Sequence, residues 1–338
     1  MTASGRPLPT KGLASEPDSL AMLQTENERL IALLEANGIK WCLTPEPTTS
    51  PPQPESSRRS TEAKVALFRQ RFRGRTDVYP VRWESRTTGK SGYAPACANE
   101  WRAGVCEKPR IKCGDCPNRS LIPLSDAAIY AHLAGDQTIG VYPLLEDDSC
   151  YFLAIDFDEA EWRKDVRAFA GSCTDLGVPV AVEISRSGNG AHAWIFFANR
   201  VSARDARRLG TAIISHTCAR TRQLELSSYD RLFPNQDTMP KGGFGNLIAL
   251  PLQKKPRESG FTVFVDSDLQ PHPDQWEFLA SIQPMSPHDI EPTIVRATGG
   301  VHPLDVTFID DEDLATPWER TSPPPARIPG AMPKSLAV

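Results

Sequence analysis

Asp156 and Asp158, two aspartates separated by one residue, are the first candidates for chemistry. The segment 151–158, YFLAIDFD, alternates as a β-strand does, so both carboxylates project from one face and Phe157 from the other. Two carboxylates at a fixed separation on a strand are suitable ligands for a hard divalent cation. Paired cations of this kind activate an attacking hydroxyl and stabilise a leaving pyrophosphate. The same spacing also occurs by chance at strand ends, so both interpretations stay open.

A glycine-rich turn separates two further predicted strands, 178–185 and 191–197. The turn consists of four small residues that let backbone amides approach a phosphate: Ser187, Gly188, Asn189 and Gly190. His192 follows on the face that Trp194 and Phe196 share, where its imidazole can donate to a phosphoryl oxygen. The alternative is an ordinary Asn-Gly hairpin turn followed by a histidine whose hydrogen bonds are satisfied in the core.

A third acidic residue, Asp230, precedes a glycine-rich segment and the buried strand predicted at 246–252. Its carboxylate can complete a metal-binding triad with the first two aspartates. Arg231 or Lys241 can neutralise phosphate charge beside it. A surface Asp–Arg pair next to a flexible loop explains the same residues without chemistry.

Four of the eight cysteines fall within twenty residues, with the spacing C-x8-C-x6-C-x2-C: Cys97, Cys106, Cys113 and Cys116. Four thiolates form a closed tetrahedral Zn²⁺ site, which is structural because no coordination position stays open. In a reducing compartment metal binding explains such a cluster better than disulfides do. We therefore predict a structural zinc knuckle over 97–116. The other four cysteines are expected to be small buried hydrophobes.

The segment 58–90 is strongly basic, with ten Lys or Arg residues against three acids, and aromatic residues are interleaved with the charges. This composition suits a phosphate backbone whose bases stack on aromatic rings. The candidate nucleic-acid-binding residues are Arg71, Arg73, Arg75 and Arg82. A solvated basic surface is the alternative interpretation.

The elements that must position these residues follow the order of an α/β, more narrowly α+β, fold. Helices are predicted at 160–176 and 202–223, the second with Ser202 as N-cap and Asp205 three residues later. A further strand is predicted at 261–266. Strands and helices in this order indicate a sheet with helices packed on one face.

Composition sets the outer limits of what the chain can be. Its 338 residues are 40% apolar and 24% charged, which supports a sizeable core and excludes wholesale disorder. The net charge of −4 means that any nucleic-acid contact must come from a local patch. No apolar run approaches the roughly 20 residues that cross a bilayer, and the first residues do not resemble a signal peptide. We expect a cytoplasmic protein without a membrane partner.

Proline-rich segments suggest three regions: 1–57 with a tail, a helix at 19–39 and a linker, a catalytic domain at 58–283, and an extension with a tail at 284–338. Apolar residues and one asparagine follow heptad spacing in the helix: Leu20, Leu23, Asn27, Leu30 and Leu34. An asparagine at a core position often selects a parallel dimer. Two heptads are marginal for a coiled coil, so a homodimer through 19–39 and packing on its own domain both stay open.

Taken together, these motifs resemble the archaeo-eukaryotic primase superfamily. The narrower resemblance is to the primase domain of TOTE conflict systems and to CRISPR-associated primase-polymerases. It covers about residues 64–283 and is carried by FRGRTDVYPVRW, the closing CxxC, GVYPLL, DFD, SGNGAHAW, YDRLFPNQD and KGGFGNLIALPLQ, in that order.

The resemblance implies a catalytic core with a sheet like that of an RNA-recognition motif and a nucleotidyl-transfer site that uses Mg²⁺ or Mn²⁺. Asp156 and Asp158 match the first acidic motif of the family and Asp230 the third. His192 matches the histidine that contacts the incoming nucleotide, and Gly190 stands where the family often has serine. Cys97 to Cys116 match its cysteine-rich insertion. Related chains often continue into helicase and nuclease regions, so a helicase or nuclease partner is expected, and unwinding must come from a partner.

The function expected from this resemblance is a primase-polymerase. It would transfer a nucleotidyl group from an NTP or dNTP onto a 3′-hydroxyl on a single-stranded DNA template, with or without de novo initiation. Two alternatives belong to other classes. One is a non-catalytic, zinc-containing nucleic-acid-binding adaptor, which would have no need for three acids and the histidine. The other is a template-independent terminal transferase, which the sequence does not separate from a templated enzyme.

Overall fold

The computed structural model describes the chain except for residues 1–15, 38–58, 86, 159, 221–227 and 301–338. The chain divides into two compact units, Met1–Gln53 and Pro54–Val338. The Pro-rich linker and the tail beyond 300 predicted from the sequence lie outside the described residues. Within the part that is described, no helix is long and apolar enough to cross a membrane.

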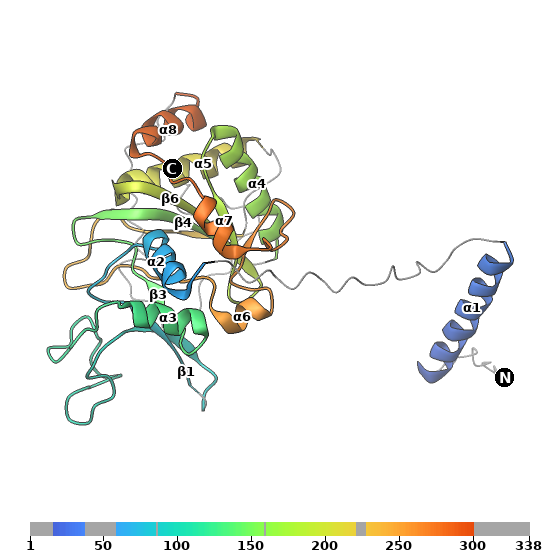
Figure 1. Ribbon diagram of the computed structural model, residues 1–338, viewed down its shortest axis with the longest axis horizontal. Helices are drawn as coiled ribbons and strands as arrows, with labels where there is room; N and C mark the ends of the chain where they lie inside the picture. The colour runs from blue at the N-terminus through green and yellow to red at the C-terminus, as the bar shows by residue number, and fades with distance from the viewer. Residues whose placement is uncertain (1–15, 38–58, 86, 159, 221–227, 301–338) are drawn as a thin grey trace, which may run out of the picture. The chain divides into compact units, whose positions relative to one another are not determined.

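A five-stranded antiparallel sheet forms the centre of the second unit, with strand order β7-β4-β6-β5-β9 (Figure 1). Its strands are β4 (Ser149–Asp158), β5 (Ala181–Ile184), β6 (Gly190–Ser202), β7 (Tyr229–Phe233) and β9 (Phe264–Val265). Helix α4 (Trp162–Leu176) joins β4 to β5, and α5 (Ala203–Arg220) joins β6 to β7. The chain therefore runs β-α-β-β-α-β through the first four of these strands.

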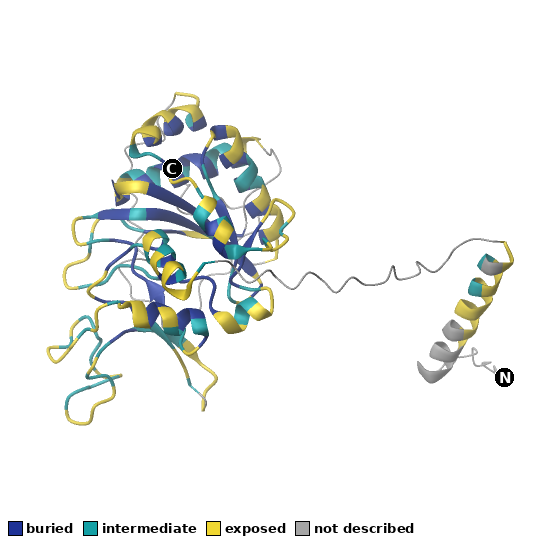
Figure 2. Cartoon of the chain, viewed as in Figure 1, coloured by how far each residue is buried: buried dark blue, intermediate teal, exposed yellow. Residues whose placement is uncertain are grey.

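Three helices cover one face of the sheet: α4, α5 and α8 (Ile290–Thr298), which follows the short 3₁₀ helix η1 (Pro287–Asp289). Alternate β4 residues, Leu153, Ile155 and Phe157, belong to the core on this face and are fully buried. In Figure 2 the ribbons of the central strands are largely in the colour of buried residues. Residues beyond 283 share this core, because Ile290 and Ile294 of α8 are buried in it. Burying side chains of this size supplies most of the packing free energy of such a layer.

The opposite face packs against the N-terminal half of the unit. Phe152, Trp194 and Phe196 from the sheet pack here with Phe68 and Phe72. The helices on this side are α2 (Thr61–Arg71), α3 (Asp126–Ala134), α6 (Lys254–Glu258) and α7 (Gln275–Ser281). Two small sheets complete it: β1 (Pro80–Glu84) with β2 (Ser91–Pro95), and β3 (Gly140–Val141) with β8 (Ile248–Ala249).

The mixed α/β architecture predicted from the sequence is confirmed, with boundary shifts of a few residues. The predicted capping box is present: the Ser202 hydroxyl accepts from the Asp205 amide at 3.0 Å and donates to its carboxylate at 2.7 Å. The expectation of helices on one face only was incomplete. The helices α2, α3 and α7 on the second face were not predicted, because their residues were interpreted as a basic segment and as loops.

The first unit contains one described helix, α1 (Glu16–Ala36). Three of its large apolar side chains are exposed, Met22, Leu30 and Leu33, and so is Asn27. Exposed apolar side chains agree with the predicted homodimer through this helix but do not test it, so the homodimer stays a prediction.

Candidate active site

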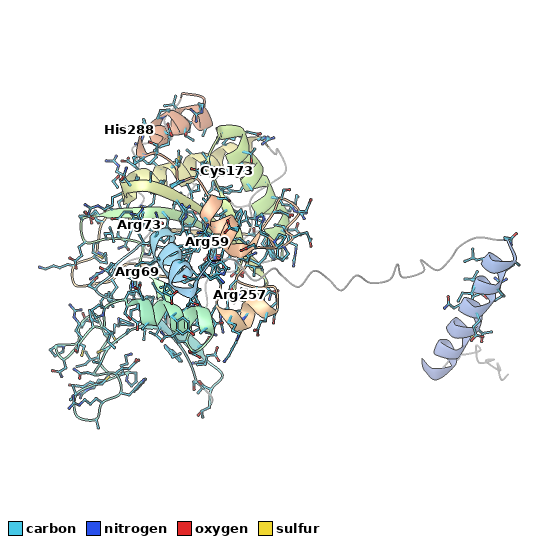
Figure 3. All side chains as sticks on the ribbon, in the orientation of Figure 1. Arg59, Arg69, Arg73, Cys173, Arg257 and His288 are labelled. Atoms are coloured by element: carbon cyan, nitrogen blue, oxygen red, sulfur yellow. The ribbon has the colours of Figure 1, made fainter. Side chains whose placement is uncertain are left out.

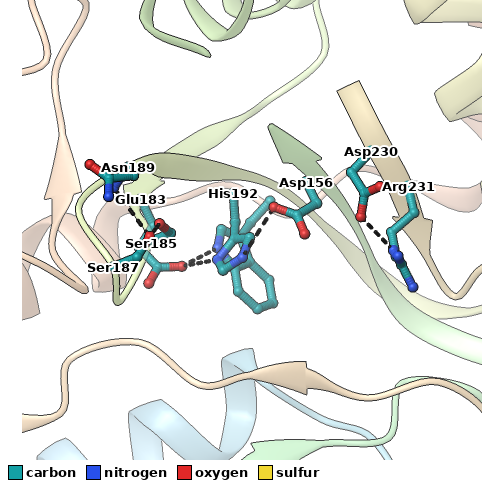
Figure 4. Close-up of polar contacts among 9 residues, drawn as sticks. Asp156, Glu183, Ser185, Ser187, Asn189, His192, Asp230 and Arg231 are labelled. Atoms are coloured by element: carbon teal, nitrogen blue, oxygen red, sulfur yellow. Dashed lines mark hydrogen bonds and ion pairs between the residues drawn. The ribbon is translucent and has the colours of Figure 1, made fainter. Parts of the chain in front are cut away.

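Four charged residues lie side by side across four neighbouring strands. Glu183 on β5 pairs in register with His192 on β6, His192 pairs with Asp156 on β4, and Asp156 pairs with Arg231 on β7. Their signs alternate across the sheet, and Figure 4 shows them on one level. We call these four residues the charge row. It lies on the face of Trp194, beyond the point where the aromatic core ends.

His192 lies between two carboxylates. Its Nδ1 is 2.9 Å from Glu183 Oε2, and its Nε2 is 3.6 Å from Asp156 Oδ1 (Figure 4). Burial by itself lowers the pKa of His192, but the charge and hydrogen bond of Glu183, together with the charges of Asp156 and Asp158, raise it to about 9. The neighbouring carboxylates therefore favour the charged imidazolium form of His192.

Asp230 reaches the row through an irregularity in strand pairing. Asp156 is opposite Arg231 but Phe157 is opposite Tyr229, so Asp230 is the extra residue of a bulge in β7. A bulge re-aims a side chain and bends the strand locally. The bulge therefore brings the third predicted acid next to the first pair.

The three aspartates form one electrostatic cluster. Burial raises the pKa of Asp156, and the carboxylates of Asp230 and Asp158 raise it further, against the lowering effect of His192 and Arg231. Carboxylates that repel one another in this way are the hard oxygen donors that Mg²⁺ and Mn²⁺ bind. The donor set therefore fits a divalent cation.

The carboxylates are not arranged as a finished metal site. Asp230 Oδ2 accepts from Arg231 Nε at 2.7 Å, and the Asp156 carboxylate faces His192 (Figure 4). In the described part of the chain no group of three His, Cys, Asp or Glu side chains has the geometry to hold a metal ion. Binding of a cation would require these side chains to turn from their protein partners.

The turn 187–190 adjoins the acidic cluster, because Gly190 pairs in register with Asp158. A Cβ at Gly190 would lie 2.5 Å from the Phe157 carbonyl oxygen, so no side chain fits where the family often has serine. Gly188 has a φ of +74°, and a Cβ there would meet the Phe261 ring at 2.4 Å. Hydroxyls are still present: Ser185 Oγ and Ser187 Oγ are 3.0 Å apart beside Gly190.

The four clustered cysteines all line one small cavity of about 20 Å³. Lys108, whose ammonium is 2.7 Å from Glu100, interacts with the Cys113 thiol, and burial raises the pKa of that thiol. None of the four forms a disulfide. The described cysteines provide no set of three metal ligands, so the predicted zinc site is not supported. For the segment 97–116, the structure shows that its four cysteines line the same cavity.

The predicted nucleic-acid-binding arginines mostly make contacts within the protein. Arg71 donates to the carbonyls of Leu279, Ala280 and Ile282 at the end of α7. The other three have different partners: Arg73 stacks on Tyr151 at 3.9 Å, Arg75 pairs with Asp77 and Glu146, and Arg82 pairs with Glu84. Arg59 and Arg69, also near α2 (Figure 3), pair with Glu277 and Asp126. Much of the basic segment thus joins α2 to its neighbours.

Lys241 is not part of the acidic cluster. With Arg75, Arg119 and Phe244 it lines an open hollow of about 530 Å³, whose wall includes Asp148. Asp148 immediately precedes β4, eight residues before Asp156. At about 3.3 Å per strand residue, Asp148 lies roughly 25 Å along β4 from Asp156. Of the two cations predicted near Asp230, only Arg231 is beside it.

Two residues of this site, Glu183 and Ser185, were not among the residues predicted from the sequence. Both lie in the predicted strand 178–185, where Glu183 is the only charged residue. A glutamate in an otherwise apolar strand is the signal that could have found it, since such residues are almost never fully buried unless paired. Glu183 is 1% exposed.

A family model for the archaeo-eukaryotic primase domain of the TOTE conflict system matches residues 63–293, well over half of the chain. The chain belongs to this family. The archaeo-eukaryotic primase match includes the central sheet and every residue of the charge row. It confirms the resemblance that the sequence motifs indicated.

Among solved structures, the polymerase domain of Mycobacterium tuberculosis ligase D in complex with DNA resembles this primase domain at 13% sequence identity and a TM-score of 0.33. The similarity covers 71% of this chain and 90% of that chain. A TM-score this low does not bear on function. No curated protein matches the chain. Family membership therefore rests on the family model, and it suggests nucleotidyl transfer.

Proposed function

We propose that this protein is a primase-polymerase that transfers a nucleotidyl group from an NTP or dNTP onto a 3′-hydroxyl on a single-stranded DNA template. The observation that carries the proposal is the meeting of three carboxylates, a cationic histidine and a glycine-rich turn at one end of the sheet. Three carboxylates close together at the edge of an aromatic core repel one another, and this repulsion lowers the stability of the fold. A purely structural role does not explain why they are there.

Asp156, Asp158 and Asp230 would hold divalent Mg²⁺ or Mn²⁺ in this scheme. When bound, such cations neutralise phosphate charge and lower the pKa of a coordinated hydroxyl. Asp156 is the central ligand, because it interacts electrostatically with both other carboxylates and with His192. The rigid β4 strand fixes the separation of the first pair, and the β7 bulge supplies the third carboxylate.

His192 and the turn 187–190 would bind the triphosphate. The turn offers backbone amides without side chains in the way, and the Ser185 and Ser187 hydroxyls add donors. His192 offers a positively charged N–H donor that faces the carboxylates. Catalysis would be mainly positioning and charge neutralisation, as is general for phosphoryl transfer.

The proposed reaction balances without an added oxidant or reductant. The 3′-oxygen forms a bond to the α-phosphorus of the nucleotide, and the bond from that phosphorus to the bridging oxygen of the β-phosphate breaks. The hydroxyl proton leaves to solvent, and pyrophosphate takes the electron pair of the broken bond. The product strand is one nucleotide longer.

The proposal also includes the type of sheet in the catalytic core and the surface that binds the template. The β-α-β-β-α-β order supports a core like that of an RNA-recognition motif. Template binding would fall to the basic segment 58–90, with Arg71, Arg73, Arg75 and Arg82 as its candidates, each of which also contacts a group within the protein. A helicase or nuclease partner, expected from related chains, stays a prediction.

The deciding experiment compares wild type with Asp156→Ala/Asp158→Ala on single-stranded DNA, with Mg²⁺ or Mn²⁺ and labelled nucleotides, with and without a primer. Wild type should make product, and the double variant should lose it while keeping its fold and DNA binding. Asp175→Ala, at an exposed pair with Arg220 on the helical face, is the matched control and should keep activity. Synthesis by the double variant would refute the metal assignment.

The two alternatives give different results in the same assay. Extension that ignores the template sequence would identify a terminal transferase. DNA binding without synthesis under any condition would favour the non-catalytic adaptor. Elemental analysis of the purified protein tests the zinc prediction separately, since one zinc per chain, lost in Cys113→Ser, would establish it.

A further inference from the structure

Glu183 is a buried carboxylate that none of the family motifs includes. It is 1% exposed, and its Oε2 lies 2.9 Å from His192 Nδ1 and 3.0 Å from Trp194 Nε1. An indole N–H can only donate, so Oε2 is an acceptor in that contact. The same oxygen therefore accepts from the imidazole, which places the Nδ1 proton of His192 on the Glu183 side.

The carboxylate itself has little freedom to move. Strand pairing places Glu183 directly beside His192, and Trp194 is two residues further along the same strand. Trp194 is fully buried, with its ring 5.1 Å from Phe72 and 5.2 Å from Phe152. The Trp194 indole N–H, held in the aromatic core, therefore fixes the Glu183 oxygen, and that oxygen fixes the imidazole.

The contact with Glu183 sets the direction of the other ring nitrogen of His192. With Nδ1 bound to Glu183, the Nε2–H points along the charge row, where Asp156 Oδ1 lies 3.6 Å away. This distance is longer than a good hydrogen bond. The Nε2–H is therefore directed at the acidic cluster without forming a hydrogen bond to Asp156. A phosphate oxygen entering the cluster would find this donor already oriented.

We propose that Glu183, fixed by Trp194, is a positioning residue that orients His192 so that its Nε2–H donates to the phosphate chain of a bound nucleoside triphosphate. This inference rests on the proposed function, because it assigns a partner to the histidine of that site. Glu183 itself contacts no substrate in this scheme. It acts as carboxylates behind metal-bound histidines do, by setting ring orientation and proton position.

The first test is kinetic and uses Glu183→Gln, which keeps size but removes the charge. The KM for the nucleotide should rise on the order of 10-fold to 100-fold, the range for comparable supporting carboxylates, while the affinity for single-stranded DNA stays unchanged. Glu183→Asp should recover part of the loss. His132→Gln is the matched control, since it disturbs a buried histidine outside the site and should leave this KM unchanged.

The second test does not depend on catalysis. The Nδ1–H of His192, in a charge-assisted hydrogen bond, should give a low-field proton resonance in the wild-type NMR spectrum. Its loss in His192→Asn assigns it, and Glu183→Gln should shift or abolish it. Calorimetric binding of a non-hydrolysable nucleoside triphosphate should weaken in parallel in Glu183→Gln and less so in Glu183→Asp.

Three outcomes would overturn the proposal. They are a resonance that is unchanged in Glu183→Gln, a resonance shifted or lost with KM and nucleotide affinity unchanged, and a KM that rises equally in His132→Gln. Wild-type protein that binds the analogue but makes no product would contradict the proposed polymerase function while leaving the positioning result standing. The two failures are thus distinguishable.

Discussion

Two buried histidines in this protein have opposite surroundings. His132, on α3, is completely buried, and its ring lies between two backbone groups: Nε2 is 2.8 Å from the Pro251 carbonyl, and Nδ1 accepts from the Ile139 amide at 3.2 Å. His192 lies between two carboxylates. Burial lowers the pKa of His132 to about 4, whereas the carboxylates raise that of His192 to about 9.

The difference shows that partner type, more than burial, decides what a buried histidine does. One donor and one acceptor satisfy a neutral imidazole completely, and protonating His132 would direct a new N–H at the Ile139 amide. Glu183 accepts from Nδ1, and the second carboxylate, Asp156, lies 3.6 Å from Nε2, so the charges around His192 favour the imidazolium. The first arrangement supports structure, and the second supplies a cationic donor to a site that binds anions.

The largest expected effect comes from His192→Asn. The asparagine amide can still donate to Glu183, so the protein should fold, but the charged donor is lost. We expect nucleotidyl transfer to fall by about 100-fold or more, the usual cost of removing a charged donor from a phosphoryl-transfer site. Primer extension at saturating DNA measures this. Activity within threefold of wild type would contradict the role given to His192.

His132→Ala should have the opposite pattern. It removes two hydrogen bonds, leaves the Pro251 carbonyl and Ile139 amide without their partner, and opens a cavity beside Phe68. The free energy of unfolding should fall by about 2–4 kcal/mol, measured by urea denaturation. The KM for the nucleotide should not change at a temperature where the variant is folded. A changed KM for the nucleotide with an unchanged free energy of unfolding would mean that His132 acts in the site and does not support the fold.

The sequence could predict the members of the site better than their partners. Asp156, Asp158 and His192 were found because period-two alternation places them on one face, and the structure keeps them there. Glu183 escaped because its importance depends on which strand is its neighbour, and sequence alone does not fix sheet order. The arginines of 58–90 show the same limit. The local positive charge of this segment indicated a DNA surface, but groups distant in the chain, such as the carbonyls at the end of α7 bound by Arg71, contact several of its arginines.

The pH dependence of stability should separate the two histidines. The folded pKa of His132 is below its ordinary value, so its contribution is present above about pH 6.5 and is lost as pH falls toward 4, by about 3 kcal/mol. The folded pKa of His192 is raised, so its contribution is present below about pH 6.5 and is lost as pH rises through 9. Both effects place maximum stability near pH 6.5.

Denaturation curves in EDTA between pH 4 and pH 9.5 measure both slopes. His132→Gln should flatten only the acid side, and His192→Asn only the alkaline side. If His132→Gln also flattened the alkaline side, the two histidines would be coupled, and their partners would not act locally.

The smallest expected effect is that of Trp194→Phe, and it separates the two donors on Glu183. The substitution removes the indole N–H but keeps an aromatic ring against Phe72 and Phe152. Because His192 still bonds to Glu183, the KM for the nucleotide should rise less than about fivefold, well below the effect of Glu183→Gln. Steady-state kinetics of the two variants side by side measure the difference. Equal effects would mean that the orientation of Glu183, and not its charge, is what His192 requires.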